Sequence, residues 1–275
     1  MSKQLANTIT SQPLGIFDSG IGGLTVASAV NELLPNESLI YFGDTAHLPY
    51  GDKSPASIQK WSTAISDFLM QFDCKMLIIA CNSISSVAFD TVKKNIGKKA
   101  IVVNVIDPVV DYIAHQPAAK HIGVIGTKAT IRSDVYAQKI LKANKKAEVS
   151  SQATPLLAPM IEEGFFNNKI SRTIIHDYLS RPKLKNIDSL ILGCTHYPLI
   201  KPEIEQYYKN RVSIVDSAQI VAEYVREQLQ KNNLLHTGKP RKHRFFVSDY
   251  TPSFEQSTRL FFKGDVKLKK ENLWK

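Results

Sequence analysis

Short apolar runs recur along this chain of 275 residues, and their spacing leaves few folds open. The runs are rich in Ile and Val, are bounded by Gly, Asp or Pro, and alternate with longer amphipathic stretches. Such runs are typical of strands buried on both faces, as in parallel sheets covered by helices. The predicted strands are residues 14–17, 39–42, 76–80, 101–106, 122–125, 190–192 and 212–215.

The amphipathic stretches between these runs are predicted to form helices. Strands that alternate with helices indicate an α/β architecture, and ligands of α/β proteins bind at the carboxyl ends of the strands. The predicted helices are residues 23–34, 57–72, 85–95, 133–143, 170–180 and 218–231.

A faint internal repeat predicts two similar α/β halves. Three segments recur in the same order at a nearly constant offset: 15–19 with 123–127, 77–83 with 190–196, and 106–107 with 215–216. A boundary is expected near residues 107–117, where two prolines interrupt the pattern.

The net charge of +10 favours anionic ligands, and much of it lies near the C-terminus. Residues 236–275 hold ten Lys or Arg, four acids and two Phe-Phe pairs. This segment could be a nucleic-acid surface, or a final strand and helix with a solvated face and a charged tail. We favour the second interpretation and expect no nucleic-acid partner, because no nucleic-acid-binding motif accompanies the charge.

The chain contains three cysteines, Cys74, Cys81 and Cys194, and an odd number suits a reducing compartment. The N-terminal residues 1–13 lack the apolar core and cleavage site of a signal peptide. The apolar runs are shorter than the roughly 20 residues that a membrane span requires. A cytoplasmic protein without membrane contact is therefore expected.

Cys81 and Cys194 each directly follow a predicted strand, and a polar pair follows each thiol, Asn82-Ser83 and Thr195-His196. If a helix begins at that point, its N-terminal amides lower the pKa of the thiol, which can then exchange protons near neutral pH. Two such thiols facing one cleft from two halves would place an acid–base group on each face of a substrate. Inversion of a carbon centre by proton exchange requires that arrangement.

Other roles for the cysteines remain open. A lone cysteine is usually a small buried apolar residue, and Cys74 fits that description. A metal site formed by Cys81, Cys194 and His196 is disfavoured, because their spacing does not match structural zinc sites. No metal is expected.

The segment from Asp18 to Gly23 follows a strand and precedes a helix. Its glycines permit a tight turn whose free amides could hold an anion, although the spacing is not that of a dinucleotide-binding loop. Asp18 could orient a base or an ammonium group, or it could cap the helix, as could Ser19. Glu162 could be an ordinary acid at a helix start, whereas His196 is well placed to assist Cys194.

Five motifs together resemble those of glutamate racemase, in the aspartate/glutamate racemase group. They occur in that family's order, and the similarity spans about residues 14–262. The motifs are Asp-Ser-Gly-Ile-Gly-Gly (18–23), Tyr-Phe-Gly-Asp-Thr-Ala (41–46), Pro-Tyr-Gly (49–51), Ala-Cys-Asn-Ser (80–83) and Gly-Cys-Thr-His-Tyr-Pro-Leu (193–199).

The resemblance implies a cofactor-independent racemase with two pseudo-symmetric α/β domains, mainly parallel sheets and an active site in the cleft between them. It implies a first domain of residues 14–107 plus 217–262 and a second domain of residues 108–216. Residues 1–13 and 263–275 fall outside it, as a leader and a basic tail. The product, D-glutamate, would feed peptidoglycan synthesis in a bacterium, and we expect a homodimer of undetermined arrangement.

The resemblance also implies roles for individual residues. Cys81 would exchange the proton of D-glutamate and Cys194 that of L-glutamate, assisted by Asp18, Glu162 and His196. The implied substrate-binding residues are Asp18, Ser19, Tyr50, Gly51, Asn82, Ser83, Thr195 and His196.

Three residues depart from the pattern of the family. Ser83 stands where Thr is usual, Ile84 replaces a small residue, and His47 stands where Arg is usual. An isomerase of aspartate or another acid, or a nucleic-acid-associated protein that uses the basic tail, remain as alternatives. Because the tail carries none of the motifs, removal of the residues after Lys263 is expected to leave racemisation intact.

Overall fold

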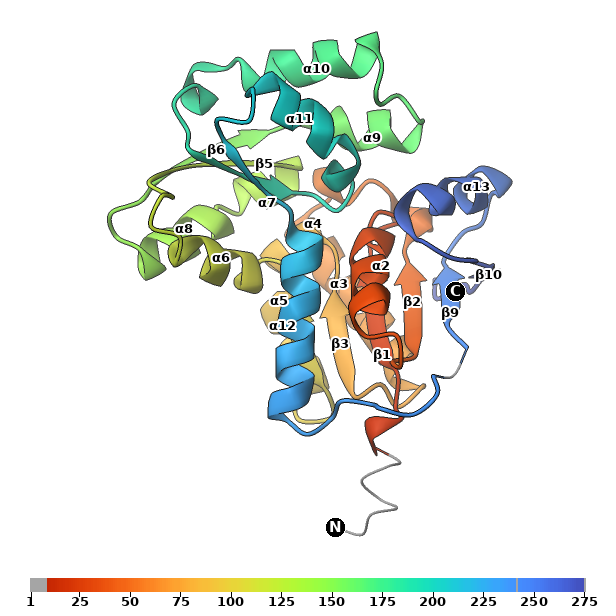
Figure 1. Cartoon of the computed structure of the whole chain (residues 1–275). Helices are drawn as coiled ribbons and strands as arrows, with labels where there is room; N and C mark the ends of the chain where they lie inside the picture. The colour runs from red at the N-terminus through yellow and green to blue at the C-terminus, as the bar shows by residue number, and fades with distance from the viewer. Residues whose placement is uncertain (1–8, 241, 275) are drawn as a thin grey trace.

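The computed structural model describes residues 9–240 and 242–274, and it contains two sheets, each accompanied by helices (Figure 1). Of the expected leader, residues 1–8 lie outside the described residues. The six strands of the first sheet, in spatial order, are β10 (Leu268–Lys270), β9 (Arg244–Val247), β2 (Leu39–Gly43), β1 (Leu14–Asp18), β3 (Met76–Ile79) and β4 (Ile101–Asn104). The four strands of the second sheet, also in spatial order, are β6 (Glu148–Ala153), β5 (His121–Gly126), β7 (Ser189–Gly193) and β8 (Ser213–Val215).

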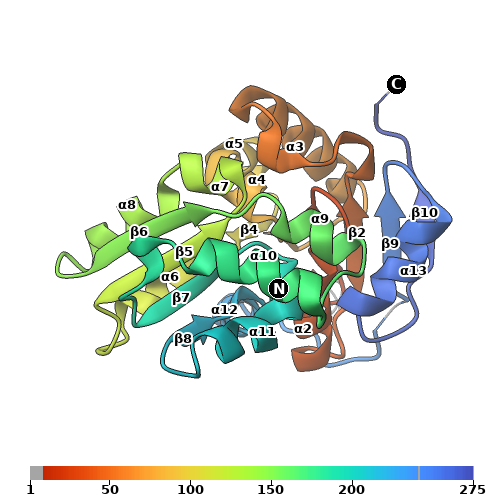
Figure 2. The same cartoon turned by 90° about the horizontal axis from the view of Figure 1, so that it is seen from above.

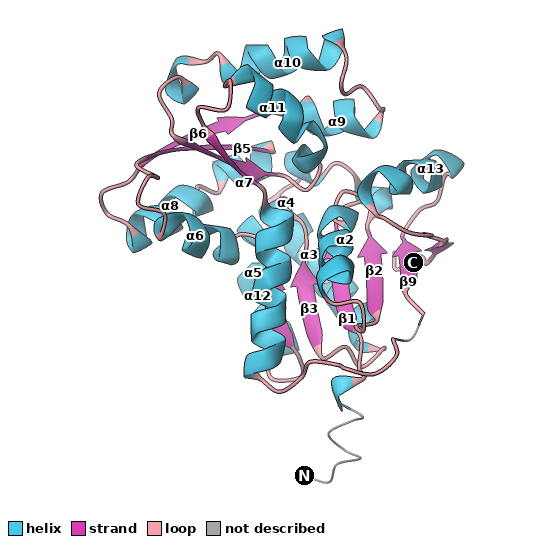
Figure 3. Ribbon diagram, in the orientation of Figure 1, coloured by secondary structure: helices cyan, strands magenta, loops and turns pink. Residues whose placement is uncertain are grey.

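Helices connect the strands and cover the sheets (Figures 1 and 3). Those that follow strands of the first sheet are α2 (Leu24–Leu33), α3 (Pro55–Met70), α4 (Asn82–Val87), α5 (Phe89–Ile96), α6 (Asp107–Ala114) and α13 (Pro252–Phe261). Those that follow strands of the second are α7 (Lys128–Arg132), α8 (Val135–Ala143), α9 (Leu157–Glu162), α10 (Lys169–Leu179), α11 (Lys201–Tyr207) and α12 (Ser217–Lys231). Short 3₁₀ turns lie at Thr45–His47, Tyr50–Asp52, Pro182–Leu184 and Tyr197–Ile200.

The apolar strands form because both faces of the first sheet are covered. Leu14 and Ile16 of β1 belong to a core with α2 and α12, whereas Phe17 belongs to a second core with α3, α4 and α5. Successive side chains of a strand point to opposite faces, so an uninterrupted apolar run supplies both cores. The first of these cores continues into the second sheet and includes Val124 and Leu192.

The predicted fold class is confirmed: every strand pair described is parallel, and the two sheets repeat one strand order. β1 is flanked by β2 and β3, with β4 beyond, just as β5 is flanked by β6 and β7, with β8 beyond. The segments of the sequence repeat therefore occupy corresponding strands. The carboxyl ends of β3 and β7 carry Cys81 and Cys194.

The chain passes between the halves through two helices in contact, α6 and α12. α6 follows β4 of the first sheet and packs against α8 of the second, whereas α12 follows β8 and packs against α2. These crossings lie where the sequence analysis places its domain bounds, which we retain as a proposal. Among the described residues, no helix is both long and apolar enough to cross a membrane.

Some elements differ from the prediction. The expected helix 85–95 is two helices, α4 and α5, that meet at Ala88. β6 was not predicted, because its sequence Glu-Val-Ser-Ser-Gln-Ala is largely polar, as its place at the edge of the sheet allows. The first sheet also extends beyond residue 262: β10 pairs with β9 and adds a strand from the predicted tail.

Candidate active site

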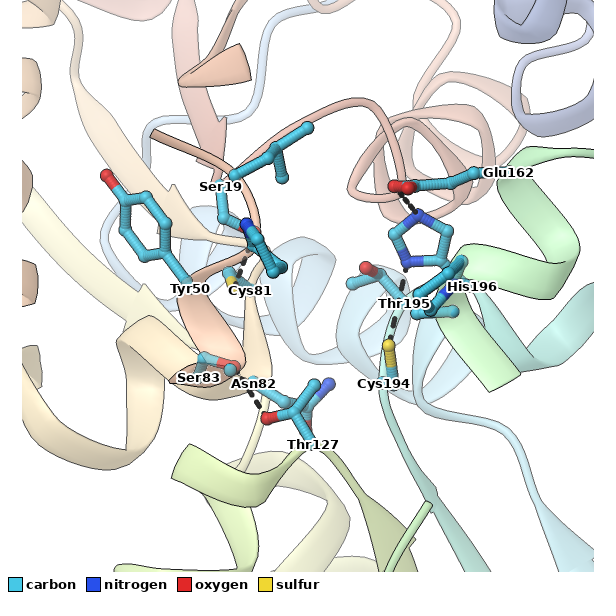
Figure 4. Close-up of a pocket in the computed structure, with 15 residues that line it drawn as sticks. Ser19, Tyr50, Cys81, Asn82, Ser83, Thr127, Glu162, Cys194, Thr195 and His196 are labelled. Carbon is cyan, nitrogen blue, oxygen red and sulfur yellow. Dashed lines mark hydrogen bonds and ion pairs between the residues drawn. The ribbon is translucent and has the colours of Figure 1, made fainter. Parts of the chain in front are cut away.

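Figure 2 shows the helices and strands of the two halves from above. One pocket lies between these halves, at the carboxyl ends of both sheets (Figure 4). The first half contributes Ser19, the segment 48–51 and the segment 81–83. The second half contributes Thr127, Ala158, Pro159, Glu162 and the segment 194–196. The pocket therefore collects residues from six segments, each of which follows a strand.

Cys81 lies at the first-half wall of the pocket, directly before helix α4. Its Sγ is 3.5 Å from the hydroxyl oxygen of Ser19, and the side chain is only 5% exposed. Burial, and next the carboxylate of Asp18, raise the pKa of the Cys81 thiol well above its usual value. The hydrogen bond with Ser19 and the Ile84 amide of α4 lower that pKa only in part. The expectation that helix amides bring this pKa toward neutrality is therefore wrong for the free protein, in which Cys81 is a thiol.

Cys194 lies at the opposite wall and has an imidazole beside it. Its Sγ is 3.6 Å from Nδ1 of His196, and Nε2 of His196 is 2.8 Å from Oε1 of Glu162 (Figure 4). Burial alone lowers the pKa of His196, but its hydrogen bonds with Cys194 and Glu162 outweigh burial and raise that pKa well above its usual value. In its protonated form, which this shift favours, His196 donates one N–H to the Cys194 sulfur and the other to the Glu162 carboxylate. The α-helix considered from the sequence does not begin directly after Cys194. A 3₁₀ turn begins at Tyr197 instead, and α11 begins at Lys201.

The surroundings of the two thiols therefore differ in charge. Cys81 has the Asp18 carboxylate behind it, which favours the neutral S–H form, whereas Cys194 has the His196 ring beside it. The two walls of the pocket thus surround their sulfurs with groups of opposite charge type.

Polar groups between the thiols connect the halves. The hydroxyls of Ser83 and Thr127 are 2.8 Å apart, and the Tyr136 hydroxyl donates to Oδ1 of Asn82 at 2.8 Å. The buried amide nitrogen of Asn82 has no hydrogen-bond partner among the described residues. A buried donor without a partner is costly, so this amide is suited to a ligand that brings an acceptor.

Tyr50 and Gly51 line the pocket, but the Tyr50 hydroxyl is bonded elsewhere. The Tyr50 hydroxyl points away from the other labelled residues in Figure 4 and donates to Oδ2 of Asp44 at 2.6 Å. Tyr50 therefore presents its ring and backbone to the pocket, and its side chain anchors the segment.

The glycine-rich segment 18–23 brings the halves into contact. A Cβ atom at Gly22 would lie 2.5 Å from His196 Nδ1 and 2.7 Å from Thr195 Oγ1, so only glycine fits there without displacement. Thr25 also donates to the Thr195 carbonyl at 3.0 Å. Glycine in this segment therefore allows close packing against the loop that carries His196. This packing explains the glycine-rich segment without the anion-binding turn that the sequence analysis considered.

All the candidate catalytic and substrate-binding residues named from the sequence line this pocket, with the exception of Asp18. Asp18 is buried behind Ser19, and its Oδ2 accepts the Gly23 amide at 2.6 Å. Glu162 is the last residue of α9, so its interpretation as a helix-start acid is wrong. Thr127 was missed, although the repeat had aligned it with Ser19.

A metal centre finds no support in the part of the chain that the structure describes. Residues 9–240 and 242–274 contain no group of three or more His, Cys, Asp or Glu side chains that could hold a metal ion. The absence of a cofactor stays a prediction.

Known proteins share both the sequence and the fold. Residues 23–225 match the Asp/Glu/Hydantoin racemase family. The chain is 42% identical to a glutamate racemase of Chlorobaculum parvum over 255 residues, which are 92% of this chain and 93% of that protein. The crystal structure of glutamate racemase from Francisella tularensis in complex with D-glutamate has a TM-score of 0.90 and 40% identity, covering 96% of this chain and 99% of that one.

A glutamate racemase isoform from Bacillus anthracis has a TM-score of 0.88 at 32% identity, and the match covers 96% of this chain and 98% of that one. These similarities confirm the resemblance that the motifs indicated. The chain therefore belongs to the Asp/Glu/Hydantoin racemase family, as a member of its glutamate racemase group, and is an isomerase.

Proposed function

We propose that this protein interconverts L- and D-glutamate by proton transfer at the α-carbon between Cys81 and Cys194, without a cofactor. One observation carries the proposal: two buried thiols, at corresponding strand ends of two similar halves, line one pocket. Asp18 lies behind Cys81, and the His196–Glu162 pair lies beside Cys194.

In the direction from L- to D-glutamate, the Cys194 thiolate removes the α-proton from one face of the substrate. The electron pair of the broken C–H bond is delocalised into the α-carboxylate. The Cys81 thiol then donates its proton to the opposite face. Cys194 ends as a thiol and Cys81 as a thiolate, so the reverse reaction uses the same groups with their roles exchanged.

The neighbours of the two sulfurs suit this direction. In the step that removes the α-proton, the protonated His196 beside Cys194 stabilises negative charge on the sulfur, and Glu162 holds the ring in place. Asp18 keeps Cys81 protonated until the substrate arrives, and the α-ammonium group of an amino acid then offsets that carboxylate. Asp18 thus acts through Cys81 from behind the pocket wall.

Substrate recognition is assigned to the polar groups between the thiols. The Asn82 amide has a free donor, and Ser83, Thr127 and Thr195 supply hydroxyls on both sides of the cleft. The similar protein of Francisella tularensis was crystallised with D-glutamate, which supports glutamate as the ligand here.

Glutamate should be preferred over aspartate. Aspartate is shorter by one methylene, so it cannot reach donors at both ends of the pocket, and an unpaired polar group costs about 1–3 kcal/mol. We expect kcat/KM for aspartate to be lower by about 10- to 100-fold. Circular dichroism of each L-amino acid with purified protein measures this ratio, and comparable turnover of aspartate would reassign the specificity.

The experiment that tests the proposed function is racemisation in heavy water. Purified protein, treated with a chelator and given no pyridoxal phosphate, should convert L-glutamate to D-glutamate that carries solvent deuterium at the α-carbon. The incoming hydrogen comes from a thiol that exchanges with solvent. Activity that appears only after zinc or pyridoxal phosphate is added would refute cofactor independence, and product without deuterium would refute the two-thiol mechanism.

The D-glutamate formed would supply peptidoglycan synthesis, a role supported by the membership in the glutamate racemase group and by the bacterial sources of the similar proteins. A cytoplasmic location fits three unpaired thiols, all buried. The homodimer stays a prediction.

A further inference from the structure

The C-terminal segment folds back onto the first half and reaches the chain that forms the pocket wall. After β10, the Glu271 amide donates to the Val247 carbonyl at 2.9 Å, and Leu273 and Trp274 pack against the core that contains Tyr50. The indole Nε1 of Trp274 donates to Oδ1 of Asp44 at 3.0 Å. The tail therefore packs on the first half beside the pocket wall, whereas the sequence analysis expected a charged tail outside the motifs that is not needed for racemisation.

Asp44 joins the tail to the pocket wall. It is fully buried, and its Oδ1 accepts hydrogen bonds from Trp274 and from the Ser248 hydroxyl at 2.6 Å. Its Oδ2 accepts the Tyr50 hydroxyl at 2.6 Å and lies 2.8 Å from Nδ1 of His47. One buried carboxylate thus holds both the end of the chain and the side chain that anchors the pocket wall.

Aromatic contacts hold the same segment from the side. The His47 ring stacks on Trp61 at 4.1 Å between centroids and meets the edge of Trp274 at 4.8 Å. Tyr50 also packs against Trp61, at 5.3 Å. We call His47, Trp61 and Trp274 the tryptophan clamp. Its imidazole is the residue that replaces the usual arginine, and a flat ring suits the space between two indoles.

The tryptophan clamp lies directly beside substrate-contacting chain. Leu48, Pro49, Tyr50 and Gly51 follow His47 without interruption, and all four line the pocket. Neither thiol touches the clamp in any contact described: Cys81 bonds to Ser19, and Cys194 bonds to His196. The clamp can therefore affect the shape of the binding pocket without altering the groups that move the proton.

We propose that Trp274 is a positioning residue that holds segment 48–51 in the shape that binds substrate. The proposal rests on the proposed function for its substrate, glutamate. It predicts that loss of the indole raises KM for glutamate and leaves kcat nearly unchanged, because a wall that contributes equally to ground and transition states affects binding alone. It also reverses the expectation that removal of the residues after Lys263 leaves racemisation intact.

The kinetic test compares three variants of the full chain. Trp274→Leu removes the hydrogen bond and the aromatic edge, and KM should rise by about tenfold with kcat within about twofold of wild type. Trp274→Phe retains the aromatic edge and should give a smaller rise. Lys267→Ala, which removes an exposed charge from the same tail, is the matched control and should match wild type. An unchanged KM in Trp274→Leu, whatever its melting temperature, overturns the proposal, as does a loss confined to kcat.

A second measurement follows the fluorescence of Trp274 and does not depend on turnover. The chain has two tryptophans, and both belong to the clamp, so Trp61→Phe leaves Trp274 as the sole indole. In that variant, saturating D-glutamate should reduce acrylamide quenching of the Trp274 emission, because a bound ligand steadies the wall that the indole contacts. Quenching that is identical with and without bound glutamate overturns the proposal. A wild-type protein that binds glutamate without racemising it would refute the proposed function alone, and this binding measurement then decides the role of Trp274.

Discussion

Replacement of either Cys81 or Cys194 by alanine should lower kcat for racemisation by about 10²- to 10⁴-fold or more, because each variant lacks one of the two proton-transfer groups. L- and D-glutamate have equal free energies in water, so kcat/KM must fall by the same factor in both directions. Circular dichroism from each enantiomer measures the loss. A variant that racemises at a near-normal rate would refute the two-thiol mechanism.

The same variants should retain one half of the reaction each. Cys81→Ala keeps Cys194 and should exchange the α-hydrogen of L-glutamate with heavy water while the product remains L-glutamate. Cys194→Ala should do the same with D-glutamate alone. Proton NMR of the α-position follows both exchanges, and exchange of the opposite enantiomer would reverse the assignment of the two faces.

Cys74→Ala is the matched control for these variants. Cys74 precedes β3, and its thiol donates to the Leu69 carbonyl at 3.2 Å, away from the pocket. Burial raises the pKa of Cys74 to about 12, so this thiol stays protonated at neutral pH. Its removal should leave kcat and both exchange reactions unchanged.

His196→Gln should lower kcat by about 10²- to 10³-fold, because the Cys194 thiolate then loses its adjacent cation. Since the pKa of His196 is raised, the imidazolium persists through neutral pH and is lost only as pH rises through that raised value. In wild type, kcat should therefore fall at high pH. In His196→Gln the high-pH fall due to His196 should disappear.

Two further variants serve as comparisons for the His196→Gln prediction. Glu162→Gln keeps a hydrogen-bond acceptor for Nε2 of His196 but removes the charge, so its high-pH fall should begin at lower pH with a smaller loss of kcat. His176→Gln alters an exposed histidine on α10 that does not line the pocket, and it should match wild type. A His196→Gln protein with a wild-type pH profile would show that the imidazole does not control the ionisation of Cys194.

The sequence revealed the parts of the fold that burial dictates. β1, β3 and β7 are buried throughout and mostly apolar, because helices cover both of their faces, and their ends carried the residues that drew attention to the site. β6 escaped prediction because an edge strand tolerates polar side chains. The break between α4 and α5 also has no sequence signal of the Gly or Pro kind.

The sequence predicted the site residues that are chemically reactive and that recur in the internal repeat. It did not predict those features of the site that depend on tertiary packing. The thiols and His196 were visible because their residue types are reactive and their spacing repeats. That Asp18 stands behind the wall, and that the Tyr50 hydroxyl is occupied by Asp44, depend on how loops pack. The position of Trp274 beside Asp44 joins residues separated by almost the whole chain, which no local pattern can encode.

The pairing of β2 with β9 has a consequence for synthesis of the protein on the ribosome. Ile40 is in register with Arg244, so the first sheet stays incomplete until residues 244–270, which form β9 and β10, have been made. The second sheet uses only residues 121–215 and can form earlier. Contacts of such long sequence separation form slowly, so the nascent protein exposes an unpaired edge of β2 while it waits. The support that Trp274 gives to segment 48–51 depends on a residue made after β10, so a chain released before Trp274 could complete both sheets and still lack that support.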